Sequence, residues 1–136
     1  MVNGLSSYSH KIYATDISFS YKICKDKKIT LLKENLLSKK KSNKIKNCDI
    51  FIHNAAITKS NKNENKSLCN ANINLTKKAL IRAKKLNCKK FFFVSSTAVY
   101  RKFSKRKYNE RSKTFALDNY TKSKLIGEKI SKEFCS

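Results

Sequence analysis

Four short apolar runs of strand length are separated by longer polar or mixed segments. They are KIYATDIS at 11–18, KKITLL at 27–32, CDIFIHNAA at 48–56 and KKFFFVSS at 89–96. Where such runs are continuously apolar rather than alternating, they are typical of strands buried on both faces of a parallel sheet. The pattern therefore predicts four parallel strands.

Two other segments follow a helical period. Residues 67–86 place apolar side chains three and four positions apart, and Asn87 is suited to the left-handed conformation that ends a helix. A last helix begins at Asp118 or Asn119, either of which can cap it; its apolar positions are Leu125, Ile126 and Ile130. Residues 101–117 are polar and basic, which predicts a surface loop. Strands that alternate with helices indicate an α/β fold with a parallel sheet.

Length and charge limit the classes of function. The chain has 136 residues, enough for one domain, and a formal net charge of +23. Such a charge attracts nucleic acid or anionic surfaces without sequence specificity. Only four of the 32 basic residues are Arg, the side chain preferred for bidentate phosphate and guanine contacts. We therefore favour compositional bias of an A+T-rich genome over a dedicated nucleic-acid surface, and keep the latter as an alternative.

Cysteine usage and hydropathy indicate a reducing, non-membrane setting. The five cysteines form no C-x-x-C motif and do not group with histidine, so we interpret them as incidental reduced thiols and expect no metal site. No apolar run approaches the ~20 residues of a membrane-spanning helix, and the polar start differs from a signal peptide. A cytoplasmic location with no membrane partner is expected.

Candidate chemistry collects where strands end. In an open parallel sheet, ligands bind beyond the carboxyl ends of the strands. Ser95 and Ser96 end the fourth apolar run, and Tyr120 and Lys124 share one face of the following helix. An ammonium one turn away favours a phenolate, so a tyrosine in this arrangement can act as a general acid or base. The set suits hydride transfer with a nicotinamide.

These motifs, in this order, resemble the extended short-chain dehydrogenase/reductase family of NAD-dependent epimerases and dehydratases. The resemblance rests on HNAA at 53–56, NINLT at 72–76, FFFVSSTAVY at 91–100 and YTKSK at 120–124, followed by Glu128. It covers roughly residues 2–134. Each motif alone is weak, whereas their common order and spacing are specific.

The resemblance implies a role for each matching residue. Tyr120 matches the catalytic acid/base, Lys124 the residue that activates it and binds the nicotinamide ribose, and Ser96 the donor that orients the reacting oxygen. Asp16 matches the acidic residue that binds the adenosine ribose and indicates NAD rather than NADP; its alternative role is a turn residue. The other implied cofactor contacts are Asn35, Leu36, Asn54, Ala55, Ala56 and Asn72. Asn35 replaces a family Asp, and His53 is predicted to be a core residue.

The chain departs from the family at both ends. Family members begin with a strand and a G-x-x-G-x-x-G loop that holds the pyrophosphate, whereas VNGLSSYSHKIYATD at 2–16 resembles the end of the first helix and the second strand. The resemblance stops just after the Tyr-Lys helix. We therefore expect residues 1–136 to form a partial NAD(P)-binding domain. It would be a Rossmann-like doubly wound parallel sheet, lacking the first strand, the Gly-rich loop and the C-terminal substrate domain.

Three functions follow as hypotheses. The first is an NAD-dependent epimerase/dehydratase-type oxidoreductase acting on a nucleotide sugar, or a related hydroxyl or carbonyl substrate, through Ser96, Tyr120 and Lys124. The second is a non-catalytic remnant of such an enzyme. The third is a basic protein that binds nucleic acid non-specifically through its charge. A homodimer is a further expectation, since many members of the family pair through the helix of the Tyr-Lys motif.

Overall fold

The computed structural model describes residues 5, 7, 11–19, 26–38, 44–58, 65–100 and 107–135. The chain divides into two compact units, Met1–Lys46 and Asn47–Ser136, and each is described by itself. Three expectations lie wholly or partly outside the described residues: the end of a helix before residue 11, the polar segments within 38–47 and 59–66, and the basic residues 101–106. The prediction that 1–136 form one partial domain stays a prediction.

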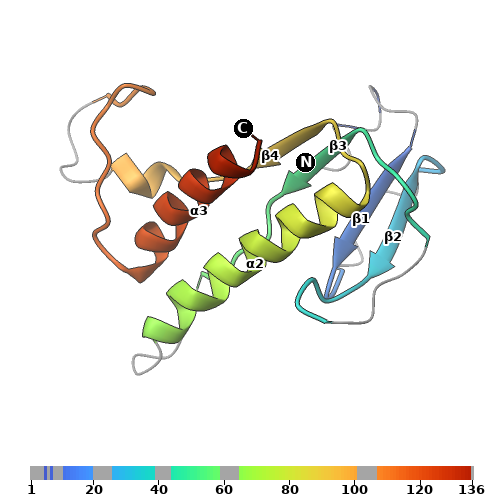
Figure 1. The fold of residues 1–136 in the computed structure, drawn as a ribbon, viewed down its shortest axis with the longest axis horizontal. Coiled ribbons are helices and arrows are strands. Elements are labelled where there is room, and N and C mark those ends of the chain that lie inside the picture. The colour runs from blue at the N-terminus through green and yellow to red at the C-terminus, as the bar shows by residue number, and fades with distance from the viewer. Residues whose placement is uncertain are drawn as a thin grey trace. The chain divides into compact units, whose positions relative to one another are not determined.

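The first unit contains a two-stranded parallel sheet. Strand β1 (Ile12–Asp16) pairs with β2 (Ile29–Lys33), with Ile12 opposite Ile29 and Asp16 opposite Lys33. A turn precedes β2, in which the Asp26 carboxylate accepts a hydrogen bond from Lys28 N at 2.8 Å. Both strands were expected from the apolar pattern, and both end at the same edge because they are parallel (Figure 1).

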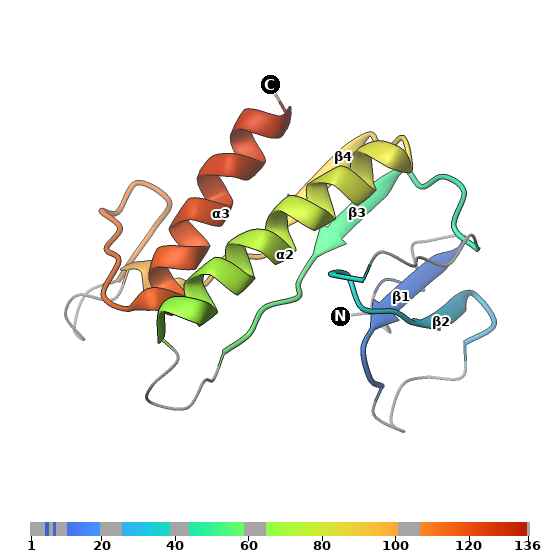
Figure 2. The same ribbon diagram turned by 60° about the horizontal axis from the view of Figure 1, so that its bottom comes forward.

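The second unit repeats this arrangement and adds helices. Strand β3 (Ile50–His53) pairs in parallel with β4 (Lys90–Phe93), in a register that sets Ile50 opposite Lys90 and His53 opposite Phe93. Helix α2 (Asn65–Lys85) connects the two strands. Figure 2 shows α2 and the last helix, α3 (Asn119–Cys135), side by side against the two strands.

The predicted fold class is confirmed as α/β with parallel strands. In the doubly wound strand order 3-2-1-4-5, strands 2 and 3 are neighbours, and so are strands 4 and 5. The pairs β1–β2 and β3–β4 correspond to those two neighbouring pairs. The strand pairing is therefore that of a Rossmann-like sheet, as the resemblance implied.

Helix α2 forms because its apolar positions make one continuous stripe. Leu68, Leu75, Ala79, Leu80 and Ala83 are buried, and so is Leu86 just beyond the helix. The helix ends in a Schellman motif. Asn87 takes a φ of 52° and donates to Lys84 O at 3.0 Å, while Cys88 N donates to Ala83 O at 3.1 Å. The prediction that Asn87 would end this helix in a left-handed conformation is confirmed.

The described residues between β4 and α3 include one short helix that the sequence pattern did not predict. This 3-10 helix, η1 (Thr97–Tyr100), follows β4 after three residues and contains the buried Val99. Phe115 N donates to Val99 O at 2.7 Å, which ties the later part of the segment back to η1. The described residues 107–117 have no strand or helix, in agreement with the predicted loop.

One expectation about burial was wrong. The continuous apolar runs predicted strands covered on both faces, but Ile50 is 52 % and Phe92 51 % exposed. The reason is that both described helices of this unit lie on the same side of β3 and β4. The opposite side therefore presents apolar side chains to solvent.

Helix α3 packs closely because its buried face is small and polar. Thr121, Ser123, Lys124 and Ser131 are buried, whereas Leu125, Ile126 and Ile130 are half-buried. Gly127 faces the Phe93 ring so closely that a Cβ at position 127 would overlap its Cζ atom. The absence of a side chain at Gly127 therefore lets α3 approach β4.

We expect Gly127→Ala to destabilise the chain by about 1–2 kcal/mol. The overlap with Phe93 costs roughly 1–3 kcal/mol, and it exceeds the gain of up to ~1 kcal/mol from the higher helix propensity of Ala. Urea unfolding would measure the difference. Lys122→Ala, at an exposed position of the same helix, is the control and should change stability by less than ~0.5 kcal/mol. A Gly127→Ala chain as stable as the original would contradict this packing.

Candidate active site

The start of α3 is defined by Asp118. Its carboxylate accepts a hydrogen bond from Thr121 N at 2.6 Å, and Asp118 N donates to Thr121 Oγ1 at 3.0 Å. This reciprocal pair resembles a capping box and orients the first turn of the helix. Of the two caps that the sequence allowed, Asp118 is the one used. The cap positions Tyr120 in the first turn and Lys124 one turn later.

Lys124 is the central buried cation of the second unit. It is 5 % exposed, and its Nζ donates a hydrogen bond to the main-chain oxygen of Val94 at 2.8 Å. The same Nζ lies 5.1 Å from the centre of the Phe93 ring and 5.7 Å from the centre of the Tyr120 ring. The ammonium is therefore held at the carboxyl end of β4, between two aromatic faces that attract a cation.

Burial lowers the pKa of two side chains in this region. It lowers the pKa of Lys124, because removing an ammonium from water disfavours its charged form. Burial also lowers the pKa of His53 to about 4, and the positive charge of Lys124 adds to the effect. His53 lies among Phe91 and Phe93, with ring centres 6.3 and 5.8 Å away. It is a neutral core residue near neutral pH, as the sequence indicated.

The two serines after β4 have different partners. Ser95 Oγ hydrogen-bonds with the carboxylate of Glu128 on α3. Ser96 is half-buried, and its hydroxyl accepts a hydrogen bond from Ala98 N at 3.2 Å at the start of η1. Ser95 thus joins the strand end to α3. Ser96 remains the candidate for orienting a reacting oxygen.

Asn72 connects three segments of the site. Its Oδ1 accepts from Ile57 N at 2.8 Å, and its Nδ2 donates to Ile57 O at 3.0 Å and to Ser123 Oγ at 3.2 Å. Ile57 follows the segment Asn54–Ala56, which leaves the carboxyl end of β3. Asn72 therefore anchors this segment to α3. The structure gives it a positioning role, and its contact with a cofactor stays a prediction.

Two contributors were missed by the sequence analysis. Ser123 is 2 % exposed, and its hydroxyl donates to Tyr120 O at 2.6 Å while accepting from Asn72. Val94 takes part through its main-chain oxygen, which no side-chain pattern reveals. The signal for Ser123 was present in YTKSK, where a small hydroxyl residue precedes Lys124, but its partner lies 51 residues away.

The remaining predicted cofactor contacts lie in the first unit. Asp16 is the last residue of β1, and its Oδ1 accepts from Ile17 N at 2.6 Å and from Ser18 N at 3.4 Å. Asn35 and Leu36 follow the end of β2, where Asn35 Oδ1 accepts from Leu37 N at 2.9 Å. Because the strands are parallel, these residues share one edge of the sheet. Asp16, Asn35 and Leu36 therefore form one group of predicted site residues, and the residues around Lys124 form a second group.

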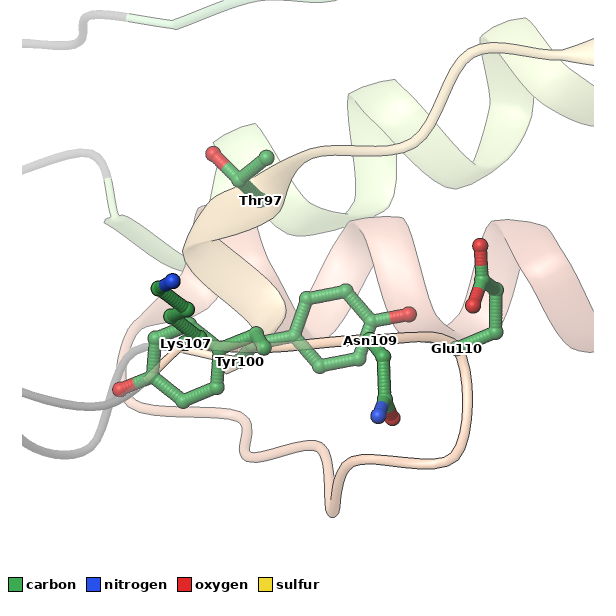
Figure 3. Close-up of a pocket in the computed structure, with 6 residues that line it drawn as sticks. Thr97, Tyr100, Lys107, Asn109 and Glu110 are labelled. Atoms are coloured by element: carbon green, nitrogen blue, oxygen red, sulfur yellow. The ribbon is translucent and has the colours of Figure 1, made fainter.

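A surface hollow lies beside η1, the short helix that begins directly after Ser96. It has a volume of about 490 Å³ and is lined by Thr97 and Tyr100 of η1 and by Lys107, Tyr108, Asn109 and Glu110 of the next segment. Figure 3 shows the labelled members of this set around the hollow. The Tyr100 and Tyr108 rings are stacked, with centres 6.0 Å apart. The lining therefore combines an aromatic wall with charged and amide groups.

Within the residues that the structure describes, no group of three or more His, Cys, Asp or Glu side chains could hold a metal ion. None of the described helices is both long and apolar enough to cross a membrane.

A sequence model of the NAD dependent epimerase/dehydratase family matches residues 4–136. This chain belongs to that family. The resemblance inferred from HNAA, the strand-end serines and YTKSK is thereby confirmed, and so is NAD as the family's cofactor.

Solved structures similar to this family member include one of an epimerase. It is the crystal structure of UDP-glucuronic acid 4-epimerase from Bacillus cereus in complex with NAD, with a TM-score of 0.66 and 25% sequence identity. The match covers 80% of this chain and 35% of that chain, so the present chain corresponds to about a third of the epimerase. A search of curated proteins found no match.

We expect Asn72→Ala to lower the free energy of unfolding by about 1–3 kcal/mol. The substitution leaves the N–H and C=O of Ile57 and the hydroxyl of Ser123 without their shared partner, and unsatisfied buried polar groups carry a cost of this size. Thermal or urea unfolding would measure it. The control is Asn74→Ala, at an exposed position of the same helix. Equal stability of the two variants would show that Asn72 does not anchor the 54–57 segment.

We expect His53 to make stability depend on pH in mildly acidic solution. Its pKa is about 4 in the folded chain and 6.5 in the unfolded one, so the unfolded state binds the proton first. The contribution of neutral His53 to the free energy of unfolding is fully present above pH 6.5. As the pH falls from 6.5 toward 4, the free energy of unfolding decreases by about 3 kcal/mol in total. The measurement compares urea unfolding of the original chain and of His53→Gln across this range. Identical pH profiles for the two would contradict a neutral buried His53.

Proposed function

We propose that this chain carries the acid/base groups of an NAD-dependent epimerase or dehydratase that acts on a nucleotide sugar. The observation behind the proposal is the position of Lys124. Its buried ammonium lies against the Tyr120 ring at the carboxyl end of β4. Ser95 and Ser96 follow shortly after this strand end in the sequence. Burying a lysine in this way is costly, and a lysine kept beside a phenol can stabilise negative charge on the phenol oxygen.

Each side chain of this group then has a chemical role. Tyr120 takes the proton of a sugar hydroxyl as that carbon is oxidised to a carbonyl, and returns it in the reverse step. Lys124 stabilises the phenolate that exists between the two transfers. The Ser96 hydroxyl donates a hydrogen bond to the reacting oxygen and orients it toward Tyr120. Asn72 acts indirectly. It donates a hydrogen bond to the Ser123 hydroxyl, which in turn donates to the main-chain oxygen of Tyr120.

The strand-end residues fit an NAD molecule chemically. When bound, NAD accepts a hydride from the substrate carbon and returns it. Asp16 ends β1 with a carboxylate, the group that binds ribose hydroxyls in such folds. Asn35 and Leu36 would border the adenine. Asn54 and Ala55 are exposed and the adjoining Ala56 is small, so the 54–56 backbone could approach the cofactor closely.

The hollow beside η1 suits a nucleotide sugar. Lys107 supplies a positive charge for an anionic group, and Asn109 and Glu110 can hydrogen-bond sugar hydroxyls. The similar solved structure is an epimerase of UDP-glucuronic acid, which supports a sugar nucleotide as the substrate class. Epimerisation at carbon 4 is the reaction that we propose first, which would make the enzyme an isomerase in overall terms. A cytoplasmic location and a homodimer stay predictions.

We expect Tyr120→Phe to lower kcat about 100-fold or more, the usual contribution of general acid/base catalysis, with little change in NAD affinity. The assay would follow conversion of UDP-glucuronic acid to its C4 epimer with added NAD, and a separate titration would measure NAD binding. Tyr13→Phe, on β1, is the matched control and should keep the original rate.

Either of two results would contradict the proposal. Turnover of Tyr120→Phe at the original rate would exclude Tyr120 as the acid/base. A chain that binds NAD but shows no turnover before any substitution would support the alternative of a non-catalytic remnant.

A further inference from the structure

The amino-terminal ends of β3 and β4 bring two cysteines together. Cys48 and Cys88 each lie two residues before the first register pair of this sheet, Ile50 and Lys90. Neighbouring strands are about 4.8 Å apart, which falls within the Cα separation of about 4.4–6.8 Å that a disulfide requires. The two thiols also interact closely enough that Cys48 contributes to the raised pKa of Cys88.

Main-chain hydrogen bonds hold both cysteines in place. Cys48 N donates to Leu86 O at 3.1 Å, and Cys88 N donates to Ala83 O at 3.1 Å in the Schellman motif. Between them, Asp49 O accepts from Lys89 N at 2.9 Å and from Lys90 N at 3.0 Å. None of these bonds involves a thiol. The main chain therefore places residues 48 and 88 side by side at the amino-terminal ends of β3 and β4.

Accessibility separates this pair from the third described thiol. Cys48 and Cys88 are half-buried, whereas Cys69 is buried within α2. A soluble oxidant can reach the pair but not Cys69. The pair also lies at the end of β3 opposite His53 and the segment that follows it, so its chemistry is separate from that of the proposed active site.

We propose that Cys48 and Cys88 are a redox modification site, at which a small-molecule disulfide of the glutathione class forms a reversible intramolecular disulfide between β3 and β4. This inference does not rest on the proposed enzymatic function. It departs from the interpretation of the five cysteines as incidental thiols.

The reaction balances as two thiol–disulfide exchanges. The Cys48 thiolate attacks one sulfur of oxidised glutathione, which forms a mixed disulfide and releases one reduced glutathione. The Cys88 thiolate then attacks the Cys48 sulfur and releases the second. Two protein thiols lose two protons and two electrons, and the oxidised glutathione is reduced. Burial, the interaction with the Cys48 thiol and the charge of Asp49 raise the pKa of Cys88 to about 12, so Cys88 ionises less readily and the first attack is assigned to Cys48.

The disulfide would stabilise the second unit. It closes a loop of about 40 residues that contains β3 and α2, and a cross-link over such a loop restricts the unfolded chain. We expect the oxidised chain to unfold at a temperature on the order of 10 °C higher than the reduced one.

The test uses the 136-residue chain with Cys24 and Cys135 replaced by Ser, equilibrated in glutathione buffers of graded oxidised-to-reduced ratio. Free thiols are then alkylated, and tryptic peptides are mapped by mass. Cys48, Cys69 and Cys88 fall on different peptides because lysines separate them. We expect one linkage, Cys48–Cys88, with an equilibrium constant at least ~10-fold higher than in strong urea, where the backbone no longer holds the pair.

Matched variants complete the test. Cys69→Ser should leave the linkage and its equilibrium constant unchanged, whereas Cys48→Ser or Cys88→Ser should leave only mixed disulfides with glutathione. The proposal is overturned if Cys69 pairs as readily as Cys88, if no intramolecular linkage forms, or if urea leaves the equilibrium constant unchanged. A chain that fails to fold would give the same equilibrium constant for the Cys48–Cys88 linkage with and without urea. The comparison with urea therefore detects that case as well.

Discussion

The burial of the Lys124 ammonium is the constraint around which the second unit is arranged. A buried charge costs several kcal/mol unless polar or aromatic groups replace its water. The Val94 carbonyl and the face of Phe93 do so here, and both belong to the end of β4. Helix α3 must therefore lie close to that strand, which Gly127 permits because it leaves room for the Phe93 ring. The same approach sets Tyr120 beside the ammonium.

A second polar connection fixes the segment after β3. Asn72 satisfies both main-chain groups of Ile57 and also reaches Ser123 on α3. Buried polar groups that are fully paired stiffen a structure and specify one arrangement of it. The segment at 54–57, the helix α2 and the first turn of α3 are thus held in one geometry. Such rigidity suits a site whose reacting groups must be placed before the substrate binds.

The two ends of the β3–β4 sheet carry different chemistry. At the carboxyl ends lie the serines, the Asn54–Ala56 segment and the Lys124 ammonium, where ligands bind in open parallel sheets. At the amino ends lie Cys48 and Cys88, which the main chain places side by side. The helix-free face between them exposes Ile50 and Phe92. The pairing of β3 with β4 thus follows the doubly wound pattern, whereas helices cover only one face of this two-stranded sheet.

Local patterns in the sequence were enough to predict the four strands, the two long helices, the Asn87 helix end and the cap before α3. Each depends on residues a few positions apart. The order and spacing of HNAA, the strand-end serines and YTKSK were likewise enough to indicate the family. The polar buried face of α3, the Asn72–Ser123 bond across 51 residues and the Cys48–Cys88 contact could not be read in this way. They arise when segments that are distant in the sequence pack together, because the path of the backbone determines which side chains come into contact and which are buried away from water.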